Sequence, residues 1–575
     1  MTDKVTDIRD HMDKVVMEDP PADPPPPEKP DRVFLPENCP VIPLGAQGDV
    51  RYYIDALGQM RDLQVRKHAR LDIMGLFGEY IDYLPENWPA YDKDGKTTGK
   101  WNSGKVEEAL LNASAAKGLI DIFGTVRETG GWVDDEGHLV MHCGKSIYRE
   151  REKLPPGPLG PHIYPSMPPG PTPLDDDPGP QAAAELMELF GAWYWKRGLL
   201  DASLLLGWVG CALLGAALDW RAVVWLTGGS AAGKSTLLKV LGAVIGSLTE
   251  VGNATAAGIW QQTRMGSNPV IYDEGEPNPD SKKMQAVIEL ARLACDGKIV
   301  LRGGADHTGS QFMAQMMFLF SSILLPPLTP QDQNRMAILE LDKVAAGAKV
   351  PDFDTRQLGI LGRGFRRRLL NRWGDVKARI EAYHKGLTAA GFGGRTADVF
   401  SALLGVAHAL ERDAPDPKFV KKTVAQMAGY LTLAVADQEA DERNCLQHLL
   451  TQVVPDQKAG DTKLTVAELI QQSVDSPPCL SAPKVLERFG LKVKLYEQVH
   501  MLFVANTHSG LARLFDGSHW GTIAGSTAPW AQSLGRLDGA VKHPSGQYFA
   551  GAKARCTMVP LNVLEGIKVK QRALL

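Results

Sequence analysis

The stretch from Val223 to Gly246 reads VVWLTGGSAAGKSTLLKVLGAVIG, and it decides how the chain folds. It opens with VVWLT, a short β-branched and aromatic run that predicts a buried strand. A loop of glycines and other small residues follows, and the apolar-periodic run from Thr236 then predicts a helix. A strand, a glycine-rich loop and a helix in this order predict an α/β fold with a parallel sheet and helices on both faces.

The loop matches the pattern G-x-x-x-x-G-K-[ST], which between a strand and a helix predicts a phosphate-binding loop. Glycines let the backbone wrap around a phosphate, and the helix N-terminus adds about half a positive charge. Lys234 is expected to reach the β- and γ-phosphates of ATP, and the Ser235 hydroxyl to bind Mg²⁺. The residues expected to hold the nucleotide are Gly228, Gly229, Ser230, Ala231, Ala232, Gly233, Lys234, Ser235 and Thr236. A chance match is the alternative, and the flanking strand and helix argue against it.

A second apolar strand, Pro269 to Tyr272, ends in the acidic pair Asp273-Glu274. Asp273 is expected to hold Mg²⁺, and Glu274 to polarise the attacking water as a general base. The alternative is a pair of exposed carboxylates at a turn. A water-activating glutamate indicates hydrolysis of ATP rather than transfer of phosphate to a small acceptor.

Two further features follow along the chain. The run MMFLFSSI, 316–323, predicts a strand that ends in Ser321 and Ser322, and Ser322 is expected to sense the γ-phosphate. The alternative is a buried strand with two satisfied hydroxyls. Arg335, just before the predicted strand MAILELD, is expected to reach the γ-phosphate of a neighbouring subunit, or alternatively to pair with Asp332 on the surface.

The stretch DGKIVLRGGADHTGSQF predicts a hairpin with strands at 298–302 and 310–315. Its cationic side chains are Lys298, Arg302 and His307. Local cations of this kind are what binding to a phosphodiester backbone requires. An ordinary surface hairpin explains the residues equally well.

The order of these features resembles the helicases of superfamily three, a ring-forming branch of the AAA+ ATPases. The stretches GWVGCALLGAALDWRAVVWLTGGSAAGKSTL, VIYDEGEP and FLFSSILLPPLTPQDQNRMAILEL are similar to the helicase part of phage, prophage and plasmid replication proteins, over about residues 182–410. The resemblance implies a homo-hexamer in the cytoplasm of a bacterial host that uses ATP and Mg²⁺ to move on single-stranded and forked DNA. It also implies a separate primase or polymerase as a partner, an arginine finger at Arg335 and a DNA-binding hairpin. The sensor strand commonly ends in asparagine in this family, and here it ends in two serines.

A second function from another class stays open, namely an ATP-hydrolysing assembly or regulatory switch that never unwinds DNA. The 63 basic and 67 acidic residues give a net charge of −4, so no overall positive field indicates a nucleic-acid partner. A nucleotide kinase is disfavoured by Glu274 and by the length of 575 residues.

That length predicts several domains. The predicted segments are a disordered acidic and proline-rich tail (1–40), an α/β accessory domain (41–150), a Pro/Gly linker without helix or sheet (151–181), the ATPase core (182–345), a helical lid or bundle (346–455) and a small, winged-helix-like domain (456–575).

No acidic metal-binding triad is evident before Leu154, so primase activity is not expected. The arginine-rich stretch 363–372 predicts a solvated helix face, with a lid arginine at the nucleotide as the alternative. Trp520 and Trp530, with cations nearby, indicate either nucleic-acid contact or a core.

The remaining sequence features indicate in which cellular compartment the protein works. Seven cysteines lie far apart with no C-x-x-C pair, which predicts a reducing environment. The charged N-terminus predicts no signal peptide. The apolar run Leu204 to Leu218 is shorter than the roughly 20 residues of a membrane-spanning helix, so we expect a buried helix packed on the sheet and no membrane partner.

Overall fold

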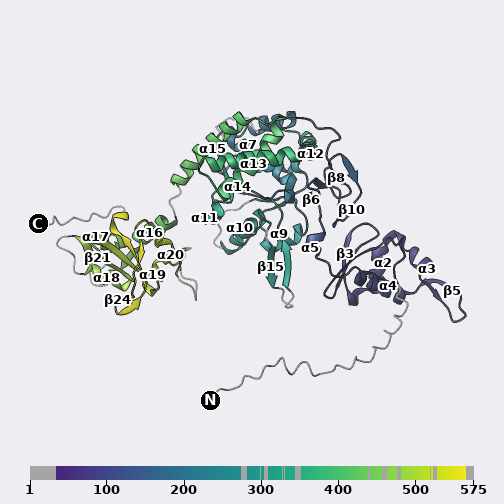
Figure 1. The fold of residues 1–575 in the computed structure, drawn as a ribbon, viewed down its shortest axis with the longest axis horizontal. Helices are drawn as coiled ribbons and strands as arrows, with labels where there is room; N and C mark the ends of the chain where they lie inside the picture. The colour runs from purple at the N-terminus through teal and green to yellow at the C-terminus, as the bar shows by residue number, and fades with distance from the viewer. Residues whose placement is uncertain are drawn as a thin grey trace, which may run out of the picture. The chain divides into compact units, whose positions relative to one another are not determined.

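The computed structural model describes residues 34–273, 281–297, 299–303, 309–326, 328, 330–343, 351–437, 441–455, 463–475, 481–518, 520–521 and 528–564. The chain forms two compact units, Met1–Val424 and Ala425–Leu575 (Figure 1). The predicted disordered tail lies outside the described residues as far as residue 33.

The first unit is built on a five-stranded parallel sheet with the order β13-β14-β17-β12-β18. Its strands are β12 (Val223–Gly228), β13 (Thr249–Val251), β14 (Val270–Tyr272), β17 (Phe318–Ser322) and β18 (Met336–Leu341). The three inner strands are buried along their whole length, because helices cover both faces of a parallel sheet. The α/β fold and the four strands predicted around the loop, the acidic pair, the serines and the arginine are confirmed.

Helices complete the core of this unit. They are α6 (Gln181–Phe190), α7 (Leu199–Leu214), α8 (Lys234–Ile245), α9 (Ala256–Thr263), α10 (Ser281–Cys295), the short α11 (Pro330–Gln333), α12 (Thr355–Asn371), α13 (Trp373–Ala389) and α14 (Arg395–Glu411). Helix α15 (Pro417–Asp437) begins in this unit and ends in the second. Helices α7, α13 and α14 pack together (Figure 1). The stretch Leu199–Ala217 is long and apolar enough to cross a membrane, but 78% of its most apolar window is buried inside the fold. The Trp208 indole N–H donates to the Phe318 carbonyl of β17 at 3.1 Å, so α7 is the predicted buried helix on the sheet.

The accessory part of the first unit begins with a three-stranded antiparallel sheet. Its elements are β1 (Ile42–Gln47), β2 (Val50–Ile54), β3 (Met60–Gln64), α2 (Arg70–Phe77), α3 (Tyr83–Asn87), β4 (Pro89–Tyr91), β5 (Thr97–Trp101), α4 (Ser103–Ala116) and α5 (Ile122–Thr125). Helix α4 begins where the Asn102 side chain accepts the Lys105 N–H at 3.1 Å. Strands β2 and β3 pair antiparallel on either side of the turn at Gly58.

Six short strands follow, and three of them lie inside the segment predicted to lack regular structure. They are β6 (Gly130–Val133), β7 (Leu139–His142), β8 (Ile147–Arg149), β9 (Glu152–Leu154), β10 (Gly157–Leu159) and β11 (His162–Tyr164). Strands β6 to β9 form one antiparallel sheet, and β10 pairs with β11. The prediction that 151–181 forms neither helix nor sheet is therefore wrong. A two-stranded ribbon consists of edge strands, where the missing N–H of Pro158 is tolerated.

The second unit is a small α/β unit around a four-stranded antiparallel sheet, β21-β22-β26-β23. Its elements are α16 (Asp441–Thr451), β19 (Val453–Pro455), β20 (Lys463–Thr465), α17 (Val466–Val474), α18 (Ala482–Arg488), β21 (Leu491–Tyr496), β22 (Val499–Ala505), α19 (Ser509–Leu514), α20 (Pro529–Leu534), β23 (Val541–Lys542), β24 (Gln547–Phe549), β25 (Ala552–Ala554) and β26 (Cys556–Pro560). Trp530 is buried, donates to the Ala505 carbonyl at 3.0 Å and stacks on Phe515. Trp520 is also buried, so both tryptophans belong to the core and not to a nucleic-acid surface.

Glu411, the last residue of α14, is expected to make the first unit less stable as the pH rises. Burial raises the pKa of its carboxyl to about 7, so the folded state keeps a proton that the unfolded chain releases near pH 4.5. The stabilisation is complete below pH 4.5 and is lost as the pH passes 7. The Glu411→Gln side chain is neutral at every pH, so this variant should keep about 2 kcal/mol more of its free energy of unfolding at pH 8 than the wild type.

Urea unfolding of both proteins between pH 5 and pH 8 measures this difference. His408 acts in the opposite direction, because burial lowers its pKa to about 4 and stability is lost as the pH falls from 6.5. Comparison of the two proteins isolates the contribution of Glu411, since both contain His408. An identical pH dependence in the two proteins would exclude a proton on Glu411.

Candidate functional site

The glycine-rich loop lies between the end of β12 and the start of α8, as predicted. Gly233 is the N-cap of α8 with φ +87°, a left-handed conformation that suits glycine. A Cβ at this position would lie 2.8 Å from Nε1 of Trp193. The same indole N–H donates to the Gly233 carbonyl at 3.1 Å, so the loop is held against the segment before α7.

Lys234 begins α8, and its ammonium group folds back over the loop. Its Nζ donates to the Gly228 carbonyl at 2.6 Å and to the Gly229 carbonyl at 3.2 Å. Ser235, in the first turn of the helix, is exposed. The loop therefore presents a cation, a hydroxyl and a helix N-terminus at one place, a combination that suits an anionic phosphate chain.

The carboxyl ends of three neighbouring strands meet at the edge of the sheet beside this loop. In β17, Ser322 is paired in register with Thr227 of β12, and Phe320 is paired with Tyr272 of β14. Asp273 directly follows β14 and donates its N–H to the Val251 carbonyl at 2.9 Å. The sheet order thus brings the loop, Asp273 and Ser322 to the same edge, where open α/β sheets bind ligands. Glu274 lies outside the described residues.

The two serines at the end of β17 differ in their surroundings. Ser322 is buried, and its Oγ accepts the indole N–H of Trp225 at 2.8 Å. The Trp225 ring stacks on Phe320 with centroids 4.6 Å apart. Ser321 is also buried, but its Oγ has no hydrogen-bond partner in the part of the chain that the structure describes. Ser322, the residue predicted as sensor, thus holds a tryptophan in place as an acceptor and keeps its own O–H as a donor, as does Ser321.

Ser322→Ala is expected to lower the free energy of unfolding of the first unit by about 1–3 kcal/mol, because it leaves the buried Trp225 N–H without an acceptor. Ser321→Ala removes a hydroxyl with no described partner and should change this free energy by less than about 0.5 kcal/mol. Urea denaturation followed by tryptophan fluorescence measures both. Equal losses in the two variants would mean that the Trp225 contact contributes nothing specific.

Arg335 lies at the amino ends of the parallel strands, whereas the loop lies at their carboxyl ends. It immediately precedes β18, whose first residue Met336 is paired with Val223 at the start of β12. A strand of 6 residues spans roughly 20 Å, so Arg335 is that far from the carboxyl edge of its own sheet. The Asp332 carboxylate, considered above as its surface partner, lies 3.5 Å from Arg292. The position places Arg335 away from the loop of the same chain.

The predicted hairpin between the acidic pair and the serine strand is present. Strands β15 (Ile299–Gly303) and β16 (Gly309–Met313) pair antiparallel beside α10 (Figure 1). Arg302 is paired with Ser310 within this ladder. Lys298 and His307 lie outside the described residues.

Segment 193–197 was not among the predicted site residues, although its sequence, WYWKR, is an unusual aromatic and basic run. Besides the contact of Trp193 with the loop, the Tyr194 carbonyl accepts the Asp342 N–H at 2.7 Å, just beyond the end of β18. Lys196 pairs with Glu340 at 2.8 Å. The segment thus ties the end of β18 and the loop together, and Tyr194 itself is 45% exposed.

The five arginines of the stretch 363–372 neither form a solvated face nor lie close to the loop. They contact backbone carbonyls and carboxylates: Arg363 with Thr172, Arg366 with Ile245 and Gly362, Arg367 with Leu174 and Glu150, Arg368 with Ala409 and Asp177, and Arg372 with Asp375 and Asp413. Three of the five are nearly fully buried, so the prediction of a solvated face is wrong. Helix periodicity does not reveal this, because the carbonyls belong to distant segments that only the fold brings near.

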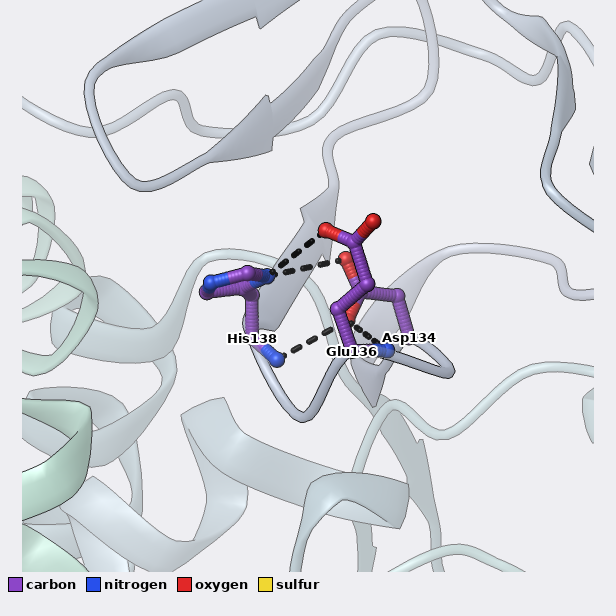
Figure 2. Close-up of side chains that lie close together, drawn as sticks. All are labelled: Asp134, Glu136 and His138. Carbon is purple, nitrogen blue, oxygen red and sulfur yellow. Dashed lines mark hydrogen bonds and ion pairs between the residues drawn. The ribbon is translucent and has the colours of Figure 1, made fainter.

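A cluster of possible metal ligands lies in the turn between β6 and β7, although none was expected before Leu154. Asp134, Glu136 and His138 hold their ligand atoms within 4.8 Å of one another. Figure 2 shows the imidazole facing both carboxylates, at 3.5 Å from Asp134 and 3.4 Å from Glu136. Arg149 lies 3.6 and 3.7 Å from the same two carboxylates. The Arg149 guanidinium thus offsets charge on these acids, and the Asp134 Oδ1 accepts two backbone N–H groups of the turn. We assign the cluster to turn formation.

The comparisons with known proteins give a distant fold likeness only. No protein-family model matches the sequence, and no curated protein matches it. Among solved structures, the A-form apo structure of the NrS-1 C-terminal region has 11% identity and a TM-score of 0.31, and the match covers 72% of this chain and 94% of that one. The A-form apo structure of its residues 305–718 has 10% identity and a TM-score of 0.30, with 74% and 95% covered. A likeness this distant carries no functional argument.

Proposed function

We propose that this chain is an ATP-dependent DNA helicase with a superfamily-three AAA+ core, of the kind that phages, prophages and plasmids use for replication. The observation that carries the proposal is the meeting of the loop with Asp273 at one sheet edge, with a single strand between them. Two strand spacings leave about 10 Å between the loop and the acidic strand, which is room for a γ-phosphate and an attacking water. A phosphate loop without this acidic strand would support nucleotide binding but not hydrolysis.

The residues present suit ATP and Mg²⁺. Lys234 would hold the β- and γ-phosphates, and the Ser235 hydroxyl with the Asp273 carboxylate would hold the metal. Bound Mg²⁺ would neutralise charge on the phosphates. Glu274 follows Asp273 directly and is the proposed general base that orients the water.

Ring assembly is proposed from the position of Arg335. This residue lies at the amino ends of the strands, and the loop lies at their carboxyl ends. It can therefore complete a catalytic site only on a neighbouring subunit. The protruding β15-β16 hairpin is the proposed DNA contact, with Lys298, Arg302 and His307 as its cations. An ATP-driven switch without unwinding is the competing proposal, and the near-neutral net charge is its support.

Steady-state ATP hydrolysis with and without single-stranded DNA tests the proposal. The wild type is expected to be stimulated several-fold, and Glu274→Gln to be inactive under both conditions. The double variant Lys298→Ala/His307→Ala should retain basal hydrolysis and lose the stimulation, whereas Lys385→Ala, on the exposed face of α13, should retain both. Hydrolysis that depends on Glu274 but ignores DNA would favour the switch, and a stimulated ATPase that cannot separate a forked duplex would exclude the helicase.

A further inference from the structure

A cavity of about 340 Å³ lies in the first unit, at the end of α8 that is remote from the phosphate loop. Its walls are the ends of β6 and β7, the proline-rich residues 167–171, the turn from α8 into β13, the end of α9, and Arg366 of α12. Helix α8 has 12 residues, so the cavity is roughly 18 Å from Lys234. It is therefore separate from the candidate ATP site.

Arg366 is the charged group that distinguishes this cavity. Only 7% of the residue is exposed, and its guanidinium donates to the carbonyls of Ile245 at 2.6 Å and Gly362 at 3.2 Å. Ile245 ends α8, so the negative end of that helix offsets part of the positive charge. No carboxylate pairs with Arg366 among the residues that the structure describes, and burial lowers its pKa to about 10. A guanidinium has five N–H donors, and these two bonds use two of them.

Neutral hydrogen-bonding groups surround this cation. The cavity is lined by the side chains of Ser247, Thr249, Thr263, Gln262 and Asn268. Burial shifts the pKa of each other titratable group of the cavity toward its neutral form. It raises the pKa of the Cys143 thiol to about 11, lowers the pKa of His142, and raises the pKa of the Glu128 carboxyl, on which the charge of Arg264 acts in the opposite direction.

The proline-rich wall is held in place by close backbone contacts. Gly170 donates its N–H to the Cys143 carbonyl at 3.0 Å. Gly246 has φ +70°, and a Cβ there would lie 2.5 Å from Pro171, so only glycine allows this approach. Gly144 approaches the Pro168 carbonyl in the same way. The cavity is thus preformed, as small-molecule sites commonly are.

We propose that this cavity binds a small anion that carries a carboxylate or phosphate group, with Arg366 as its main partner. A buried cation without a counter-charge is costly, and a bound anion with charge-assisted hydrogen bonds offsets that cost. The volume is within the range of small-ligand sites, roughly 300–1,000 Å³. The Thr263 hydroxyl already donates to the Ile259 carbonyl, and the Asn268 amide donates one hydrogen to Thr129, so the hydroxyls of Ser247 and Thr249 and the amide of Gln262 are the donors suited to the remaining anionic oxygens.

Equilibrium dialysis of the full chain with radiolabelled inorganic phosphate tests this site. Phosphate also suits the loop at Lys234, so the assay uses the Lys234→Ala background. One phosphate per chain is expected in that background. Adding Arg366→Met should weaken binding at least tenfold, while Arg356→Met, which removes an exposed charge from the same helix, should leave it unchanged.

A pair of variants at the exposed mouth residue Gln262 keeps the test valid if Arg366→Met does not fold. Gln262→Glu should weaken phosphate binding several-fold, and Gln262→Lys should strengthen it several-fold. Displacement of the label by citrate identifies a carboxylate ligand, and failure of citrate to displace it identifies a phosphate ligand. No binding in the Lys234→Ala background, or binding that is indifferent to Arg366 and Gln262, overturns the proposal.

Discussion

Replacement of Lys234 by alanine is expected to lower the rate of ATP hydrolysis at least about 10²–10³-fold, the loss that follows removal of one preorganised charge donor from an active site. Its ammonium group is already positioned at the loop by the Gly228 and Gly229 carbonyls, at 2.6 and 3.2 Å. Those bonds are made to the carbonyls of Gly228, which is buried at the end of β12, and Gly229, which is half-buried. Because alanine is a good helix former, α8 should survive the substitution, and nucleotide affinity should fall together with turnover.

Lys239→Ala is the matched control, because Lys239 lies on the exposed face of the same helix. It should hydrolyse ATP at the wild-type rate. Circular dichroism of both variants checks that α8 is intact, and binding of a fluorescent ATP analogue separates lost affinity from lost turnover. If Lys234→Ala kept more than a tenth of the wild-type rate, the loop would not be the catalytic site.

The strands at the candidate site were predictable because each carries a strong local signal. VVWLT and FLFSS are β-branched or aromatic runs too short for helices, and each ends in polar or glycine residues. Parallel strands share one carboxyl edge, so the loop and Asp273 were expected to meet there. The position of β17 between β12 and β14 was not predictable, since strand order is set by packing between distant segments.

Other features depended on contacts that no local pattern encodes. The role of Trp193 arises from a bond to Gly233, 40 residues along the chain. The burial of Arg366 and Arg367 arises from carbonyls that lie 121 and 193 residues away in sequence. Arginine is a charged residue, so a surface position is expected for it from sequence alone. These two arginines are buried instead, because backbone carbonyls accept hydrogen bonds from their guanidinium groups.

The same limit applies to the two serines of β17. Sequence places both at the end of a strand and cannot distinguish their hydroxyls. The alternating direction of side chains along the strand sends Ser322 to the face of Trp225, and Ser321 to the other face. If a hydroxyl of this strand senses phosphate, either serine can donate to it, because Ser322 accepts from Trp225 and keeps its own O–H.

Mixing two inactive variants, Arg335→Ala and Lys234→Ala, is expected to restore ATP hydrolysis. In a ring, an Arg335→Ala subunit supplies an intact loop, and a Lys234→Ala neighbour supplies an intact arginine. With random assembly at equal amounts, half of the subunits have the loop and half of their neighbours have the arginine, so about a quarter of the interfaces are complete. The mixture should reach about a quarter of the wild-type rate per chain, measured after the variants exchange subunits.

The matched control is a mixture of Lys234→Ala with Glu274→Gln. The loop and the acidic pair belong to one subunit's sheet edge, so no interface in this mixture contains both groups intact, and no rescue is expected. This contrast follows from the sheet itself. Asp273 lies at the carboxyl edge with the loop, and Arg335 lies at the amino edge, one strand of 6 residues away. Rescue in both mixtures would indicate simple stabilisation by assembly, and rescue in neither would remove Arg335 from the catalytic site.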